Sequence, residues 1–380
     1  MAADVEQNIA KLKVNEMIEL FTPLIAKAKV GKDMPSINLS GPPGVGKSDG
    51  IRELAARVAK LKGKTAVVHD VRLLNMNPVD LRGIPAKVET SIMRMVVGKP
   101  QEEKVAVARW LRPEIFQMDE RDDIINFLFL DEITAAPQSV QSAAYQIVLD
   151  RKIGEHELPS NCFVFAAGNR VIDKSVAYRM PKALANRMCH LEIYADLDDW
   201  KKWALANDID ERIIGFLNFC SKPALFAFDP SNDDLAYPTP RSWAKASEFL
   251  KMLPNLNFAL PLVAGCVGMG MATEFLGYTN VYASLPNVNA IFEGKAVEHP
   301  KKMDVCYALS SSLVSMSKKA NKNQLNNMLT WMVDWAADYT TLTIKDMIKI
   351  DDMINTVSKC KAWVELYKKN QKFISTVQSA

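Results

Sequence analysis

The sequence predicts an α/β fold: a five-stranded parallel sheet with helices on both faces, followed by an α-helical lid and a helical C-terminal extension. Two observations predict it. Short, continuously apolar runs alternate with amphipathic stretches in the first half of the chain, and helical periodicity dominates the second half. Strands that are buried on both faces form continuous apolar runs, so this alternation favours a parallel sheet over an antiparallel one.

The elements of this sheet follow one another along the chain. Apolar residues at helical spacing predict a helix over 5–29, and two further helices are expected over 47–61 and, opened by Pro137, over 137–149. The five expected strands are short apolar runs at 36–40, 65–70, 126–131, 161–167 and 189–194. The helices over 47–61 and 137–149 then lie between strands, as a parallel sheet requires for its crossover connections.

A long passage separates the second and third expected strands. From Lys47 to Asp131 there are 131 − 47 = 84 residues, more than a compact β-α-β-α-β passage requires. The passage contains a Gly83-Ile84-Pro85 turn and a segment over 88–97 that indicates a hairpin.

The remainder of the chain is expected to be helical. We predict three regions: a nucleotide-binding α/β domain over 1–195, a helical lid over 196–253 and a helical extension over 254–380, with a loop over 229–240 and helical stretches over 325–339 and 344–367. The stretch 252–273 has no charged residue, but prolines, asparagines and glycines interrupt it. Its best continuous part, 258–272, is shorter than the roughly 20 residues of a membrane span, so we predict a buried helix there.

The composition excludes several classes of protein. The 380 residues are 48% hydrophobic and 24% charged, which excludes wholesale disorder, collagen and a disulfide-stapled mini-fold. With 47 Lys and Arg against 44 Asp and Glu, the chain has no overall field that would attract nucleic acid, which leaves only a local basic patch open. Six scattered cysteines without a CxxC pair indicate buried free thiols and a reducing cytoplasm, and the N-terminus lacks the features of a signal peptide.

A glycine-rich turn directly follows the first expected strand. Its residues fit the P-loop pattern G-x-x-x-x-G-K-[ST] and are Gly41, Pro42, Pro43, Gly44, Val45, Gly46, Lys47 and Ser48. The glycines let backbone N–H groups turn inward around phosphates, and the following helix N-terminus adds a favourable dipole. The pattern therefore predicts binding of ATP, with Lys47 on its β- and γ-phosphates and the Ser48 hydroxyl on Mg²⁺.

Two carboxylates end the third expected strand. Asp131 and Glu132 follow the apolar run Phe127-Leu128-Phe129-Leu130. At the end of a buried strand, Asp131 is expected to join Ser48 in holding Mg²⁺, while Glu132 orients and polarises the attacking water.

At these residues the chain resembles the AAA+ ATPases and, among them, the MoxR-like group, over roughly 37–243. The resemblance implies that Asn169, after Phe165-Ala166-Ala167-Gly168, is the sensor 1 residue that places the water. It implies an arginine finger acting on the neighbouring subunit's nucleotide, with Arg187 favoured and Arg179 and Arg170 as competitors. Arg241, in Pro238-Thr239-Pro240-Arg241-Ser242-Trp243, resembles the sensor 2 residue of the lid.

The resemblance further implies an ATPase that assembles into a ring, expected to be a hexamer, and remodels a protein partner. Many proteins of this group act with a partner that carries a von Willebrand factor A domain. The long passage before Asp131 resembles an insertion of this group, and the segment 151–158 resembles the hairpin before sensor 1; both elements usually face the ring's central pore. Two alternatives stay open at this point: a nucleic-acid motor or loader, and a nucleotide-gated scaffold with slow hydrolysis. Short lysine clusters without interleaved aromatic residues do not favour the nucleic-acid alternative.

Overall fold

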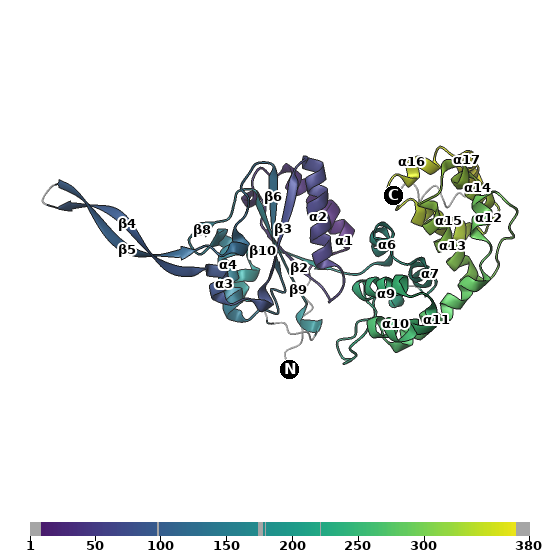
Figure 1. The fold of residues 1–380 in the computed structure, drawn as a ribbon, viewed down its shortest axis with the longest axis horizontal. Helices are drawn as coiled ribbons and strands as arrows, with labels where there is room; N and C mark the ends of the chain where they lie inside the picture. The colour runs from purple at the N-terminus through teal and green to yellow at the C-terminus, as the bar shows by residue number, and fades with distance from the viewer. Residues whose placement is uncertain (1–8, 97–98, 174–177, 179, 221, 370–380) are drawn as a thin grey trace. The chain divides into compact units, whose positions relative to one another are not determined.

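The computed structural model describes residues 9–96, 99–173, 178, 180–220 and 222–369 (Figure 1). The contacts divide the chain after Tyr194 into two compact units, 1–194 and 195–380. Each unit is described by itself below. The further division predicted at residue 253 stays a prediction.

The first unit is built on a six-stranded parallel sheet. Its strand order is β1-β10-β2-β9-β6-β3, with β1 at Lys11–Leu12, β10 at Met188–Ile193, β2 at Ser36–Ser40, β9 at Cys162–Gly168, β6 at Ile124–Asp131 and β3 at Thr65–Arg72. The five predicted strands are confirmed within a few residues. The sixth strand, β1, lies at the edge beside β10, where Lys11 pairs with Glu192.

Helices cover both faces of this sheet, as predicted. On one face lie α1 (Val14–Lys27) and α2 (Lys47–Lys62), and on the other α3 (Pro78–Arg82) and α4 (Gln138–Asp150) (Figure 1). The short helix α5 (Lys182–Ala185) packs against α4. The ring of Phe21 in α1 meets that of Phe165 in β9 edge to face at 5.8 Å between centroids. The first helix begins at Val14, later than predicted, because the preceding residues 11–12 extend the sheet.

Two antiparallel hairpins interrupt the order of strands and helices. The long one pairs β4 (Ile84–Val96) with β5 (Lys99–Leu111) and projects away from the sheet (Figure 1). The short one pairs β7 (Lys152–Ile153) with β8 (His156–Glu157). The His156 ring donates from Nε2 to the Trp110 carbonyl at 2.8 Å, so the short hairpin contacts the base of the long one. Both predicted hairpins are confirmed, and the first is longer than the 88–97 segment indicated.

The second unit is entirely helical in its described part. Its helices are α6 (Leu197–Ala206), α7 (Glu211–Cys220), α8 (Lys222–Leu225), α9 (Pro240–Met252), α10 (Ala259–Val267), α11 (Met269–Thr279), α12 (Val288–Phe292), α13 (Met303–Ser317), α14 (Lys322–Met332), α15 (Ala337–Met347), α16 (Met353–Val357) and α17 (Lys361–Lys369). Short 3₁₀ turns occur in both units, at Gly31–Asp33, Leu73–Asn75, Glu114–Phe116, Val171–Asp173, Leu256–Phe258 and Asn280–Ser284. A single hydrophobic cluster runs from Trp200 to Leu366, so the predicted lid and extension share one core.

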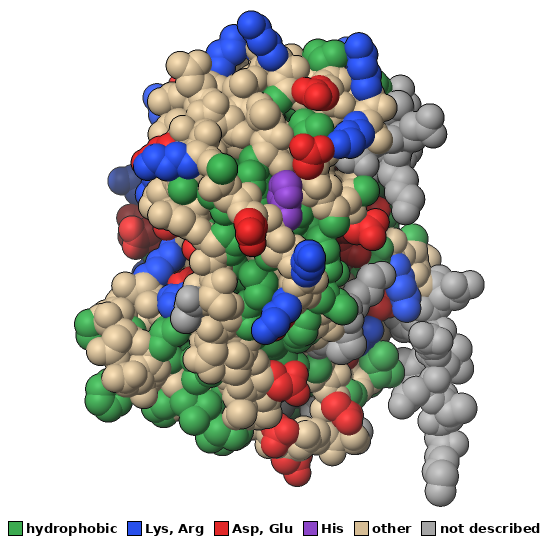
Figure 2. Space-filling model, turned by 90° about the vertical axis from the view of Figure 1, so that its right-hand side faces the viewer, with side chains coloured by type: hydrophobic (Ala, Val, Ile, Leu, Met, Phe, Trp, Pro, Cys, Tyr) green, Lys and Arg blue, Asp and Glu red, His purple; other side chains and the backbone are tan. Residues whose placement is uncertain are grey.

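The face drawn in Figure 2 is mixed in charge. On the face drawn in Figure 2, Lys and Arg side chains are interspersed with Asp and Glu, and hydrophobic side chains lie between them. Such a surface is typical of a globular protein and provides no single-sign field on that face.

The uncharged stretch 252–273 forms parts of two helices instead of one. Gly268, at φ 87°, separates α10 from α11 in a conformation that glycine adopts without a steric penalty. Val263 and Val267 are buried, whereas Met252 and Phe258 are 78% and 70% exposed, so the predicted burial holds only in part. Among the described residues no helix has the length and apolar character needed to cross a membrane.

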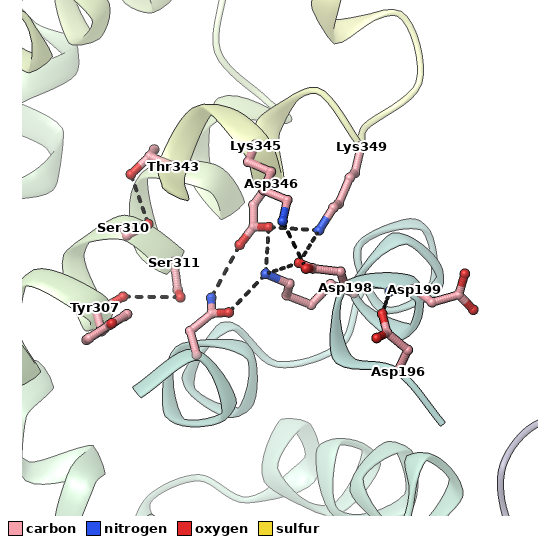
Figure 3. A network of polar contacts seen from close by, with 12 residues as sticks. Asp196, Asp198, Asp199, Tyr307, Ser310, Ser311, Thr343, Lys345, Asp346 and Lys349 are labelled. Atoms are coloured by element: carbon pink, nitrogen blue, oxygen red, sulfur yellow. Dashed lines mark hydrogen bonds and ion pairs between the residues drawn. The ribbon is translucent and has the colours of Figure 1, made fainter. Parts of the chain in front are cut away.

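A buried ion-pair network joins α6 to α15 (Figure 3). The Lys201 ammonium lies 2.8 Å from the Asp346 carboxylate, and the two side chains are 2% and 3% exposed. Lys201 also contacts Asp198 at 3.1 Å and donates to the side-chain oxygen of Asn218 at 3.0 Å. Lys349 pairs with Asp346 at 3.1 Å. Because each buried charge has an opposite partner, this network fixes the first helix of the unit against α15.

The six cysteines are all free thiols, as predicted. Cys162, Cys306 and Cys360 are buried and Cys220 and Cys266 are partly buried. The expectation of burial is wrong for Cys189, which is exposed near the start of β10.

Candidate nucleotide-binding site

The glycine-rich segment lies where β2 ends and α2 begins. Residues 41–46 connect Ser40, the last residue of β2, to Lys47, the first of α2. Strands β2 and β9 are neighbours in the sheet, but the chain continues from them in opposite directions. After β2 it runs to β3 at one edge, and after β9 it runs back past β2 to β10. Loops that diverge in this way open a crevice at the carboxyl ends of two adjacent strands, which is where parallel α/β sheets bind ligands.

The backbone of the loop requires its glycines. Gly44 and Gly46 have φ angles of 78° and 100°, in the left-handed region that residues with a side chain rarely adopt. Gly41 is required for a different reason, because a Cβ there would lie 2.3 Å from the Ile193 carbonyl oxygen at the end of β10. Val45 is buried and anchors the loop to the domain. The loop therefore presents its backbone N–H groups beside the N-terminus of α2.

Lys47 folds back over this loop. Its ammonium donates to the carbonyl oxygens of Gly41 at 2.7 Å and Pro42 at 3.0 Å, and to the Asn169 side-chain oxygen at 3.2 Å. The residue is only 9% exposed. A cation held above glycine-rich backbone is placed to exchange its carbonyl partners for phosphate oxygens. The contact also brings together two residues that the sequence predicted separately, Lys47 and Asn169.

Ser48 and Asp131, which the sequence assigns to one predicted Mg²⁺ site, also contact each other. The Ser48 hydroxyl donates to one carboxylate oxygen of Asp131 at 3.0 Å, while the other accepts from the Glu132 backbone N–H at 2.9 Å. A hydroxyl and a carboxylate are the oxygen donors that Mg²⁺ prefers when phosphate oxygens and water complete its octahedron. The donor set therefore fits the predicted metal.

Glu132 sits in a strained turn at the end of β6. Its φ of 57° lies in the left-handed region, which is uncommon for a residue with a side chain and often marks a functional site. The next residue, Ile133, donates its N–H to the Ala167 carbonyl at 2.9 Å, which ties this turn to β9. The carboxylate thus leaves the sheet at the same edge as Asp131.

Thr134, which the sequence analysis did not single out, holds Asn169 in place. The Thr134 hydroxyl donates to the Asn169 backbone carbonyl at 3.0 Å. Gly168 makes room for this contact, since a Cβ there would lie 2.4 Å from the Thr134 hydroxyl oxygen. In the sequence, the signal for this contact was the glycine before Asn169, because a glycine in a strand lets a neighbouring segment approach closely.

Arg170, one of the three candidate arginine fingers, is bound within its own unit. Its guanidinium pairs with Asp173 at 2.6 Å and with Glu192 at 2.9 Å. The Asp173 side chain is fully buried and that of Glu192 is 10% exposed. Two carboxylates therefore fix Arg170 between the end of β9 and β10, beside Asn169.

Arg187 has a different environment. It is exposed directly before β10, and its guanidinium lies over the Tyr145 ring of α4 at 4.9 Å from the centroid. No carboxylate contact of Arg187 is found within the described ranges of the chain. The third candidate, Arg179, lies outside the described residues. Arg241 is exposed in the first turn of α9, in the second unit, behind a Thr239 cap that accepts from the Ser242 N–H at 3.0 Å. Its predicted contact with the γ-phosphate stays a prediction.

No protein-family model and no curated protein matches the chain. Several solved structures resemble it. A mutant of RuvB from Thermotoga maritima is 14% identical, covers 71% of this chain and 72% of its own, and has a TM-score of 0.36. NtrX from Brucella abortus in complex with ATP is 12% identical, covers 92% of this chain and 69% of its own, and has a TM-score of 0.38. These scores are low. The P-loop α/β fold is therefore assigned from the strand order and the glycine-rich loop of this chain.

Proposed function

We propose that the protein is an ATP-hydrolysing AAA+ motor of the MoxR-like type, which assembles into a ring and remodels a protein partner. One observation carries the proposal. Residues from three separate strand ends converge on one glycine-rich loop: Lys47 and Ser48 after β2, Asp131 at the end of β6 and Asn169 after β9. Such a set of groups suits the binding and in-line cleavage of a nucleoside triphosphate.

Binding uses the loop and the residues at the start of α2. The N–H groups around Gly44 and Gly46 bind the phosphate oxygens, and the Lys47 ammonium moves from the Gly41 and Pro42 carbonyls onto the β- and γ-phosphates. Ser48 and Asp131 would hold Mg²⁺. When bound, this ion neutralises charge that develops on the phosphoryl oxygens.

Hydrolysis requires an oriented water molecule. The Glu132 carboxylate accepts a hydrogen bond from this water and polarises it toward the γ-phosphorus, while the Asn169 side chain fixes its position. The contacts of Thr134 and Ile133 with β9 support this assignment, because they hold both groups on connected backbone. The presence of both Glu132 and Asn169 favours an active ATPase over the alternative of a scaffold with slow hydrolysis.

Arg187 is proposed as the arginine finger that acts on a neighbouring subunit's nucleotide. A finger in trans must be exposed and able to leave its resting contact, and an exposed guanidinium stacked on Tyr145 meets both conditions. Arg170 meets neither, since Asp173 and Glu192 hold it. If the finger acts in trans, turnover requires assembly, and we propose a hexamer in which Arg241 of the second unit senses the γ-phosphate.

The proposed substrate is a protein. By resemblance, the β4–β5 and β7–β8 hairpins would face the ring's pore, and a partner with a von Willebrand factor A domain is expected. The interspersed charges in Figure 2 do not favour a nucleic-acid motor on that face.

A trapping experiment tests the proposed function. Glu132→Gln should bind MgATP, assemble and retain a protein partner that wild-type protein releases on hydrolysis. A salt-sensitive, ATP-dependent capture of DNA instead would favour the nucleic-acid alternative.

A further inference from the structure

A histidine on β10 connects the strand that leads into the P-loop to the turn that carries Arg187. His190 lies directly opposite Asn38 of β2 in the parallel ladder. Its Nδ1 is 3.0 Å from the Asn38 amide nitrogen, and its Nε2 is 2.7 Å from the Ala185 carbonyl oxygen. Asn38 is buried, and Ser40, two residues later, is the last residue before the P-loop.

The two contacts fix the hydrogen positions on the ring. A carbonyl oxygen only accepts, so Nε2 carries the proton and donates to Ala185. Nδ1 is then the acceptor and receives a hydrogen bond from the Asn38 amide. The imidazole ring therefore has a partner on both nitrogens and holds a single orientation between the two segments.

The Ala185 carbonyl ends the short helix α5, which Asn186 and Arg187 follow directly. Helix α5 (Lys182–Ala185) is a single turn, and the carbonyl of its last residue, Ala185, lies where the helix runs out of N–H donors. His190 supplies a partner for this carbonyl. Two residues after Ala185, the Arg187 N–H donates to the Leu184 carbonyl at 3.2 Å, and Leu184 is buried. The backbone of Arg187 is thus continuous with the turn that His190 caps.

We propose that His190 is a positioning residue for Arg187: through the Ala185 carbonyl it fixes the arginine that one subunit presents to its neighbour, and through Asn38 it couples that arginine to its own P-loop strand. The inference rests on the proposed function, because it deepens the role of Arg187 in a trans-acting site. It assigns His190 no contact with nucleotide.

Two substitutions separate the two hydrogen bonds. The amide of His190→Gln reaches the position of Nε2 and keeps the bond to the Ala185 carbonyl. The shorter amide of His190→Asn reaches only the position of Nδ1, so it keeps the hydrogen bond to Asn38 and loses the one to the Ala185 carbonyl. His69→Asn is the matched control, because the His69 ring on β3 makes the same kind of bond, 2.9 Å to Asn126 on β6, away from Arg187.

The first readout does not depend on activity. In the full-length protein, hydrogen exchange of the Arg187 amide should quicken roughly tenfold in His190→Asn and stay at the wild-type rate in His190→Gln and His69→Asn. Unchanged exchange in His190→Asn, or equal acceleration in His190→Gln, would overturn the proposal.

The second readout is ATP turnover at saturating ATP. His190→Asn should lose roughly tenfold to a hundredfold in kcat, the effect of a misplaced catalytic group, with KM unchanged, and His190→Gln should restore most of it. A loss of kcat in His69→Asn of the same size would show a general effect on the sheet and contradict the proposal. If wild-type protein does not hydrolyse ATP, the proposed function fails, while the exchange readout still decides the role of His190.

Discussion

The Ser48 hydroxyl donates to the Asp131 carboxylate at 3.0 Å, and this contact joins the P-loop helix to the end of strand β6. The two residues are 83 positions apart in the chain. Between them lies the whole passage that contains the long hairpin, so the site depends on the sheet, not on local sequence, for its assembly. Mg²⁺ and the nucleotide would bind at this junction.

Removal of the Lys47 ammonium should weaken nucleotide binding. Lys47→Met keeps the length of the side chain but loses the charge that contacts Gly41 and Asn169. A charged hydrogen bond contributes about 1.5–3 kcal/mol, so the Kd for MgATP should rise roughly tenfold to a hundredfold. Calorimetric titration with a non-hydrolysable ATP analogue measures the change. An exposed lysine of the same helix, Lys60, provides the control as Lys60→Met, and equal affinities of the two variants would refute the role of Lys47.

Arg170 and Arg187 should differ in what their removal changes. Arg170→Ala leaves the fully buried Asp173 carboxylate without its main partner, which should lower the free energy of unfolding by about 3–5 kcal/mol. Arg187→Ala removes an exposed contact with Tyr145 and should lower it by about 1 kcal/mol or less. Urea unfolding measures both. Similar losses in the two variants would contradict the assignment of Arg170 to a structural ion pair.

A mixing experiment tests whether Arg187 acts in trans. Arg187→Ala and Glu132→Gln should each be inactive alone for different reasons, one lacking the finger and the other lacking the base. In mixed rings some interfaces combine an intact Glu132 with an intact Arg187, so ATPase activity should reappear when the two inactive proteins are combined. Absence of activity at every mixing ratio, with mixed assembly verified, would mean that Arg187 acts within its own subunit or not at all.

The buried network of the second unit makes its stability depend on pH. Burial raises the pKa of Asp346, but the ammonium groups of Lys201 and Lys349 outweigh this effect and hold that pKa below its ordinary value of 3.8. A carboxyl with a lowered pKa stabilises the fold fully above its unfolded pKa and loses this contribution as pH falls. Stability of the second unit should therefore be steady at neutral pH and decline below about pH 4.

Asp346→Asn tests the same network at neutral pH. It leaves the Lys201 charge buried beside an uncharged amide and should destabilise the second unit by about 3–5 kcal/mol. Asp334→Asn is the control, because Asp334 and its partner Lys369 are 73% and 54% exposed, and such a pair contributes about 0–1 kcal/mol. Chemical denaturation followed by tryptophan fluorescence measures both variants. Equal effects would contradict a structural role for the buried pair.

The phosphate-binding loop and the five main strands could be predicted because their signals are local. A run such as Phe127–Leu130 is apolar enough to be buried on both faces, and the pattern from Gly41 to Ser48 has a physical reason at each fixed position. By contrast, β1 has only two residues, Lys11 and Leu12, whose pairing depends on β10, almost the whole domain away in sequence. Periodicity has no means of detecting such a contact.

The sequence predicted that the second unit is helical, but it did not predict where the individual helices begin and end. The stretch 344–367 reads as one helix, yet it is divided among α15, α16 and α17, and Asp352 lies in the left-handed region at φ 59° between the first two. Tertiary packing overrides helical propensity there. Likewise Thr134 and His190 carry no motif of their own. Their roles arise from contacts with Asn169 and Ala185 that only the folded sheet creates.

The central claim is ATP hydrolysis at this loop, and one measurement tests it most directly: phosphate release from MgATP by wild-type protein and by Glu132→Gln, with binding of MgATP measured on the same samples. The account predicts that both proteins bind MgATP with similar Kd, that the wild type releases phosphate, and that the variant does so at least a hundredfold more slowly, because the water is no longer polarised. Hydrolysis by Glu132→Gln at the wild-type rate, or tight binding without hydrolysis by the wild type, would contradict it.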